Sequence, residues 1–147
     1  MRHSPQVDMY RIMLLQIKRS TVRGGVIINA KPVFLISLID LIEDGKVKNN
    51  EFFFDEALRA KYENRHKELI PDAKITPCYR PFYHLVQDGF WSVKWKNGFL
   101  KPHGLTDRRV RENVIYAKLD NVLWDVLQEQ DVRDYYREVI KDHFLNK

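Results

Sequence analysis

The chain has 147 residues, of which 44% are apolar and 31% charged, and its aromatic content of 12% excludes a disordered chain. A single domain of this length buries roughly 70% of the surface that it exposes when unfolded, so it folds without a disulfide or a structural metal. The single cysteine, Cys78, excludes an internal disulfide and is typical of a reducing compartment. With no signal peptide and no apolar run long enough to cross a bilayer, the sequence predicts a cytoplasmic protein without membrane contacts.

The formal net charge of +5 is unevenly distributed along the chain. Residues 1–31 carry six basic side chains and one acid, and residues 92–118 carry seven basic side chains and two acids. The stretches 32–91 and 119–147 each carry more acids than bases. If folding brings the two basic stretches to one face, that face attracts a polyanion. The alternative is that the lysines and arginines only keep two surface segments solvated.

Apolar spacing predicts a helix over residues 7–20, followed by a loop that contains Gly24-Gly25. Pro32 is expected at the first position of a second helix, which runs to Asp44 and is apolar on nearly every side, as a central buried helix is. A short strand is predicted over 47–54. Asp55 then caps a third helix, which runs to Lys67 with Leu58 on its buried side.

A β-hairpin is predicted in the middle of the chain, where the runs 81–86 and 90–95 flank the Asp88-Gly89 turn signal. A second turn is expected at Lys96-Asn97-Gly98, leading to a strand at Phe99-Leu100. The hairpin residues expected in the core are Phe82, Leu85 and Trp91.

Thr106 is expected to cap a short basic helix over 107–112, and residues 114–119 are predicted to be extended. Asp120 caps the next helix, and a last amphipathic helix is expected over 131–144. The inward residues of the helix after Asp120 are expected to be Val122, Leu123, Val126 and Leu127. The predicted fold class is α+β, a helix-dominated single domain over residues 1–147 with a small antiparallel sheet.

No catalytic, metal or cofactor site is predicted. The five histidines lack the spacing of metal ligands, and His66 is expected on a charged helix face. Cys78 lacks the motif of a nucleophile and is interpreted as a buried core residue without a chemical role. Pro71-Asp72 superficially resembles the start of a metal-dependent nuclease core, but the second carboxylate that such a core needs before Lys94 or Lys96 is missing.

Three groups of residues carry a resemblance to a known family. They are Ala30-Lys31-Pro32 before an apolar helix, Pro81-Phe82-Tyr83-His84-Leu85 followed by Asp88-Gly89-Phe90-Trp91, and Ala117-Lys118-Leu119-Asp120 followed by Leu123-Trp124. Over residues 10–145 the chain resembles the sulfur-binding domain that precedes the HNH nuclease domain in modification-dependent (type IV) restriction endonucleases. The resemblance implies recognition of double-stranded DNA with a phosphorothioate in its backbone, in restriction or defence, with any nuclease activity on another domain or chain.

The resemblance also implies a small apolar pocket for the sulfur. Carried over by motif, the pocket residues are Ala30, Lys31, Arg80, Pro81 and His84, with Tyr79 or Tyr83 as a further aromatic wall. The family often has His at the position of Ala30, Tyr at that of Arg80 and a smaller residue at that of His84, so a larger or more polar pocket is expected here.

Basic side chains outside the pocket are candidates for contacts with phosphates and the DNA grooves. They are Arg23, Lys94, Lys96, Lys101, Arg108, Arg109 and Arg111. The alternative to DNA recognition is a regulatory module that uses the region around Pro81 and Tyr83 to bind a protein or a small ligand. The single domain is expected to be excised from, or to lack, an HNH nuclease domain.

Overall fold

The computed structural model describes residues 3–22, 24–96 and 104–146. It is a helix-dominated α+β fold with a small antiparallel sheet, as predicted, built around one hydrophobic core. In chain order its elements are α1 (Pro5–Leu15), α2 (Ala30–Glu43), α3 (Glu56–Leu69), α4 (Tyr79–His84), the 3₁₀ turn η1 (Leu85–Asp88), β1 (Trp91–Trp95), α5 (Asp107–Asn113), β2 (Val114–Leu119), α6 (Asn121–Val126), α7 (Gln130–Ile140) and the π-helical turn η2 (Lys141–Leu145).

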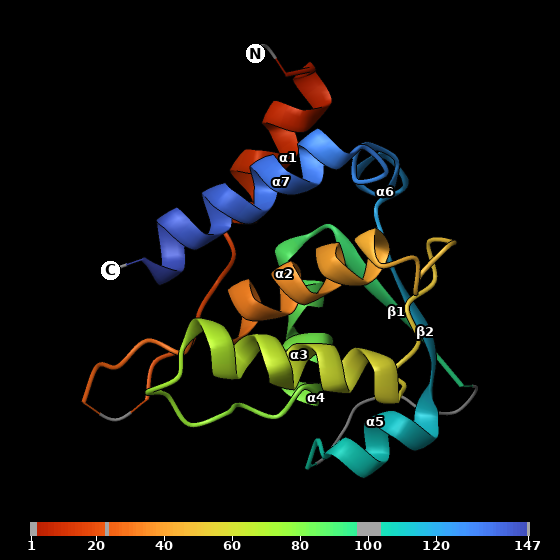
Figure 1. Ribbon diagram of the computed structural model, residues 1–147. Coiled ribbons are helices and arrows are strands. Elements are labelled where there is room, and N and C mark those ends of the chain that lie inside the picture. Colours follow the sequence, from red (N-terminus) through yellow and green to blue (C-terminus); the bar gives the residue numbers. More distant parts are fainter. Residues whose placement is uncertain (1–2, 23, 97–103, 147) are drawn as a thin grey trace.

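Helix α2 is the centre of the fold, with α1 and α7 on one side and α3 and α4 on the other (Figure 1). Every residue from Ala30 to Ile42 is buried, which confirms the prediction of a central helix. The helix begins two residues earlier than predicted, at Ala30, so Pro32 lies at its third position. Proline is tolerated there because the N–H groups of the first turn have no acceptor within the helix.

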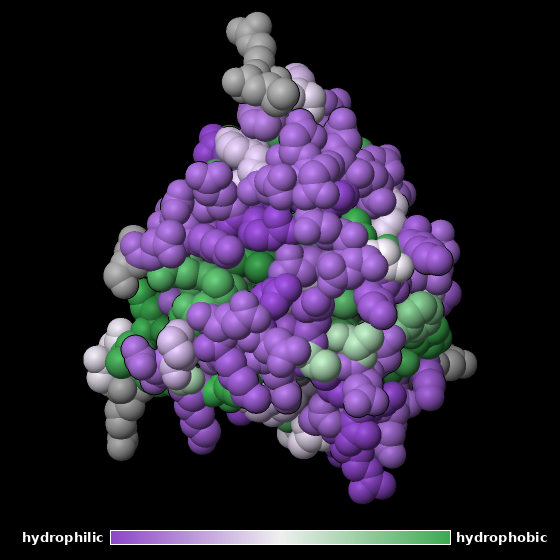
Figure 2. Space-filling view, in the orientation of Figure 1, coloured by the Kyte–Doolittle hydropathy of each residue, from purple (hydrophilic) through white to green (hydrophobic). Residues whose placement is uncertain are grey.

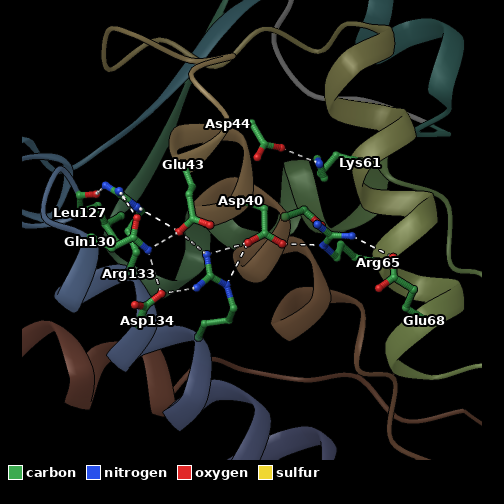
Figure 3. A network of polar contacts seen from close by, with 12 residues as sticks. Asp40, Glu43, Asp44, Lys61, Arg65, Glu68, Leu127, Gln130, Arg133 and Asp134 are labelled. Carbon is green, nitrogen blue, oxygen red and sulfur yellow. Dashed lines mark hydrogen bonds and ion pairs between the residues drawn. The ribbon is translucent and has the colours of Figure 1, made fainter.

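One buried carboxylate joins α2 to α3 and α7 (Figure 3). Asp40 accepts hydrogen bonds from Nε of Arg65 on α3 at 2.5 Å and from Nε of Arg137 on α7 at 2.9 Å. Arg137 also contacts Glu43 on α2 at 3.0 Å. Asp40 is only 6% exposed, so its charge is stable at this position because two guanidinium groups compensate it.

The aromatic core confirms the predicted burial of Phe82, Leu85 and Trp91. Phe34 on α2 packs edge-on against both Phe82 and Trp91, at ring-centroid distances of 6.2 and 5.6 Å. The indole N–H of Trp91 donates to the carbonyl oxygen of Phe82 at 2.8 Å, so its polar atom is satisfied inside the core. Cys78 is buried as expected, and burial raises the pKa of its thiol.

The predicted β-hairpin is wrong. Residues 79–84 form α4, and β1 pairs antiparallel with β2, with Trp91 opposite Leu119 and Val93 opposite Ala117. Phe82 and Leu85 lie three residues apart, which places both on one face of a helical turn but on opposite faces of a strand. Gly89 of the Asp-Gly turn signal has a φ of 94° and ends η1, so it does not connect two strands of a hairpin.

The strand predicted over 47–54 is also wrong, because only Phe52 in this stretch forms a bridge, to Ala117 within β2. The expected turn and strand at 97–100 lie outside the described residues. Residues 114–119 are extended, as predicted, and the caps at Asp55 and Thr106 are confirmed by hydrogen bonds from the N–H groups of Leu58 and Arg109.

Three helix ends differ from the predictions. The first helix stops at Leu15, and the last turns into η2 after Ile140. Asp120 precedes α6, but its carboxylate accepts a hydrogen bond from the Tyr10 hydroxyl at 2.9 Å instead of capping the helix. Burial and this carboxylate raise the pKa of Tyr10 to about 12. Val122 in α6 is 43% exposed, contrary to prediction, whereas Leu123 and Leu127 are buried and Val126 is partly buried.

Among the described residues, no helix has the length and apolar character that a bilayer span requires.

Candidate nucleic-acid interface

The start of α2 and the helix α4 form one surface pocket of about 320 Å³. Five residues predicted for the pocket line it together: Ala30, Lys31, Arg80, Pro81 and His84. They come from two segments that are far apart in sequence and that the packing of α4 against α2 brings together. The remaining walls come from residues 18–22, Ile28, Thr76 and Gln87.

One part of the wall of this pocket is apolar. Ala30 and Pro81 are buried, and Ile28 and Val22 contribute further aliphatic surface. The first turn of α2 adds the N–H groups of Ala30 and Lys31, which have no acceptor within the helix. An apolar wall beside the positive end of a helix dipole suits a ligand that is anionic but weakly hydrated.

The ammonium of Lys31 is paired inside the protein. Its Nζ lies 2.6 Å from Oδ2 of Asp88, and the two side chains are only 9% and 3% exposed. The other oxygen of Asp88 accepts the backbone N–H of Lys18 at 2.9 Å. Lys31 therefore lines the pocket with its aliphatic stem, while Asp88 compensates its charge.

Cationic groups lie around the pocket. Arg80 is exposed, and its Nε lies 3.4 Å from the hydroxyl of Tyr79. Arg19 donates to Oδ1 of Asn29 at 2.8 Å, and its guanidinium lies 4.6 Å from the ring centroid of Phe144. These contacts orient the two arginines, so cations surround a pocket whose inner wall has little charge of its own.

His84 is a neutral member of the pocket at pH 7. Partial burial lowers its pKa, and the nearby charges of Lys31 and Arg80 lower it further. A neutral imidazole can donate one hydrogen bond without adding a positive charge.

The two tyrosines of the predicted site lie apart from this pocket. Tyr83 lines a neighbouring pocket of about 330 Å³, together with His84, Val86, Gln87, Val93 and Trp95. The rings of Tyr83 and Trp95 are 6.0 Å apart between centroids. Tyr79 lies beside Arg80. His84 and Gln87 belong to both pockets, which are therefore adjacent.

The predicted DNA-contacting residues that the structure describes gather at the end of β1 and on α5. The backbone N–H of Lys96 donates to the carbonyl of Asn113 at 2.7 Å, which fixes the end of β1 against the end of α5. Lys94 lies with its Nζ 5.7 Å from the ring centroid of Tyr116 on β2. In Figure 1, α5 lies at the lower right, and the loop before α2 lies on the left. Arg23 and Lys101 lie outside the described residues.

The arginines of α5 are exposed, and two of them pair with acids one turn away on the same helix. Arg108 contacts Glu112 at 3.3 Å, and Arg111 contacts Asp107 at 2.6 Å. Exposed i,i+4 pairs are worth only a few tenths of a kcal/mol, so both guanidinium groups can exchange these partners for phosphates at little cost.

Two important residues were not found by sequence reasoning. The sequence places Asp88 in a turn and in the motif that carries the family resemblance, but it predicts no partner for this acid. His66 was expected on a charged helix face, but it is 1% exposed, so that prediction is wrong. The spacing of Leu58, Tyr62 and His66, four residues apart, places all three on the buried face of α3.

No protein-family model matches the chain, and no curated protein matches it either.

Proposed function

We propose that this chain is a DNA-recognition module that binds double-stranded DNA and recognises a phosphorothioate in its backbone. The observation that carries the proposal is the convergence of Ala30, Lys31, Arg80, Pro81 and His84 on one pocket. The proposal also draws on the sequence resemblance to sulfur-binding domains, and it places any nuclease activity on another domain or chain.

The chemistry of the pocket favours sulfur over oxygen. A non-bridging phosphate oxygen is strongly hydrated, and burying it against apolar groups without replacing its hydrogen bonds costs about 1–3 kcal/mol. Sulfur is larger, more weakly hydrated and a poorer hydrogen-bond acceptor, so it loses less on entering the same site. The pairing of Lys31 with Asp88 strengthens this preference, because a free ammonium at the wall would attract oxygen more than sulfur.

Affinity for the rest of the duplex is supplied by exposed cations. Arg80 next to the pocket, Lys94 and Lys96 on the end of β1, and the arginines of α5 are suited to contact phosphates. Arginine is also able to form bidentate hydrogen bonds with guanine in the major groove, so we assign base contacts to α5 and backbone contacts to the lysines.

The experiment that tests the proposal is a titration of the full chain with two duplexes that differ only in one phosphorothioate, each at two salt concentrations. We expect the modified duplex to bind about 5- to 150-fold more tightly, which corresponds to the desolvation difference above. Both affinities are expected to fall steeply with salt, because several phosphates are neutralised. Equal affinities would overturn the sulfur recognition and leave general DNA binding.

The alternative function is a regulatory module that binds a protein or small ligand near Pro81 and Tyr83. The aromatic pocket of Tyr83 and Trp95 is the observation that favours it. The same titration separates the two functions, since a module of this kind binds neither duplex with a salt-dependent affinity.

A further inference from the structure

Hydrophobic side chains reach the surface at two places beside the candidate phosphorothioate pocket. One place is aliphatic and lies between the loop that leads into α2 and the segment after α3, where Val22, Val26 and Ile27 are exposed. Figure 2 shows hydrophobic residues gathered on this left side of the molecule. The other place is the aromatic pocket of about 330 Å³ between α4, η1 and β1, which contains Tyr83 and Trp95. The aromatic pocket offers flat rings on which a planar ligand can stack.

Three rings line the aromatic pocket. The ring centroid of Tyr83 lies 5.1 Å from that of His84 and 6.0 Å from that of Trp95, with interplanar angles of 88° and 50°. A planar ligand can therefore stack on one ring and contact another with its edge, and both arrangements are favourable. Val86, which is 44% exposed, and the partly buried Val93 complete the apolar wall.

The described walls of this pocket contain no acid, no lysine and no arginine. Burial and the nearby charges of Lys31 and Arg80 lower the pKa of His84, so its imidazole is neutral at pH 7. The side chain of Gln87 is exposed and has no hydrogen-bond partner among the described residues. Its amide both donates and accepts hydrogen bonds, as the edges of nucleobases do. The pocket therefore suits a neutral, planar, polar-edged group and does not suit a phosphate.

The aromatic pocket shares a wall with the candidate phosphorothioate pocket, since His84 and Gln87 line both. At its other side, Trp95 precedes Lys96, whose backbone N–H joins the end of β1 to Asn113 of α5. The aromatic pocket thus lies between the site proposed for the modified phosphate and the helix proposed for base contacts. Within one nucleotide a single sugar separates the base from the phosphate, so two adjacent sites of this kind can hold the two parts of one nucleotide.

We propose that the aromatic pocket binds an unpaired nucleobase next to the phosphorothioate, stacked against the rings of Tyr83 and Trp95 and hydrogen-bonded to Gln87. The inference rests on the proposed function, because the phosphorothioate pocket places the nucleotide. Its volume is at the small end of the range of about 300–1,000 Å³ for small-molecule sites, which suits a ligand the size of one base.

This site makes the module selective for modified DNA whose base pairing is disturbed. A base reaches a concave pocket only after it rotates out of the helix, and the cost of this rotation is lowest for a base without a partner. Stacking on an aromatic side chain then increases the affinity by about 5- to 150-fold. A phosphorothioate beside a mismatched or unpaired base is therefore bound more tightly than one in a fully paired duplex.

The test measures dissociation constants of the full chain for duplexes that carry one phosphorothioate, by fluorescence anisotropy. In two of the duplexes the base on the 5′ or the 3′ side of the modified phosphate faces an abasic site and is therefore unpaired. A third duplex is fully paired, and in a fourth the unpaired base lies one helical turn away. We expect one of the two adjacent unpaired bases to tighten binding at least about fivefold over the paired duplex, and the distant one to have no effect.

The contribution of the rings is tested with one variant and one matched control. Tyr83→Leu keeps an apolar side chain and removes one stacking ring, so it should lose most of the gain from the adjacent unpaired base. Tyr135→Leu changes a partly buried tyrosine on α7, outside the pocket, and should keep the full gain. The comparison of the four duplexes needs only the natural chain, so it is decisive even if Tyr83→Leu does not fold.

Two results would overturn the inference and leave the phosphorothioate recognition intact. They are equal affinities for the paired duplex and both adjacent unpaired duplexes, and an equal gain from the distant unpaired base. A chain that shows no preference for the phosphorothioate in any duplex would overturn the proposed function, and the inference with it.

Discussion

Lys31 at the start of α2 and Asp88 at the end of η1 form a buried ion pair of 2.6 Å. Asp88 also accepts the N–H of Lys18, so one carboxylate holds together the segment after α1, the start of α2 and the end of η1. All three segments contribute to the walls of the candidate phosphorothioate pocket, together with α4. The ion pair therefore sets the shape of the pocket and also removes a free charge from its wall.

Loss of Asp88 should destabilise the protein strongly. Asp88→Ala leaves the Lys31 ammonium buried and unpaired, for which we expect a loss of about 3–5 kcal/mol in the free energy of unfolding. Lys31→Met combined with Asp88→Leu should restore most of this stability, because no buried charge remains. Urea denaturation of the three proteins measures both effects, and a loss below about 1 kcal/mol in Asp88→Ala would contradict this role of the pair.

The cluster around Asp40 should be the second electrostatic determinant of stability. Arg137→Met removes one of the two guanidinium groups that contact Asp40, and we expect it to cost about 2–4 kcal/mol in unfolding free energy. The matched control is Asp134→Ala, which removes an exposed partner of the same arginine and should cost less than about 1 kcal/mol. Similar losses in the two variants, measured by urea denaturation, would show that the Asp40 contact is no stronger than a surface pair.

Burial of neutral His66 should make stability depend on pH. The pKa of His66 in the folded protein lies below its value of about 6.5 in the unfolded chain, so the unfolded state binds more protons. This contribution to stability is complete above about pH 6.5 and is lost as the pH falls, by at most about 1.4 kcal/mol per pH unit.

Urea denaturation between pH 7 and 5 measures this dependence. His66→Phe should have a flatter profile than the natural chain, and His143→Phe should keep the natural profile. An unchanged pH profile in His66→Phe would contradict the burial of a neutral ring.

If α5 binds DNA, its arginines should contribute to the salt dependence of binding. Arg108→Ala and Arg111→Ala should each reduce the slope of log K against log salt by about 0.9 for each phosphate that the variant no longer neutralises. Lys67→Ala, an exposed lysine on α3, serves as the control and should leave the slope unchanged. Fluorescence anisotropy at four salt concentrations gives the slopes, and identical slopes for all proteins would remove α5 from the interface.

The helices were predictable from the sequence where a local signal has only one interpretation. The all-round apolar pattern of α2 indicates a central helix, and Asp55 and Thr106 mark helix starts through their own hydrogen bonds. The segment 79–88 was not predictable in this way, because its aromatic residues and the Asp88-Gly89 turn signal are typical of a hairpin, whereas the spacing of Phe82 and Leu85 suits a helical turn. Packing of α4 against α2 decides between them, and that packing is invisible in a local pattern.

The candidate site was predictable in part for the same reason. The resemblance to sulfur-binding domains grouped Ala30, Lys31, Arg80, Pro81 and His84, and the structure places these residues around one pocket. It gave no indication that Lys31 is paired with Asp88, since such a pairing depends on where η1 ends relative to α2. Nor did it separate Tyr83 from the pocket, because the direction of that side chain follows from the helical turn of α4.

The central claim is that the pocket lined by Pro81 recognises the sulfur of a phosphorothioate. Binding of two DNA duplexes to three proteins tests this claim most directly. The duplexes differ only in one phosphorothioate, and the proteins are the natural chain, Pro81→Ala and the matched control Pro71→Ala, which alters an exposed proline outside the pocket. The quantity to measure is the ratio of the two dissociation constants. We predict that the modified duplex is preferred by the natural chain and by Pro71→Ala, and that Pro81→Ala loses most of the preference while keeping its affinity for unmodified DNA. The same ratio in all three proteins would contradict the account.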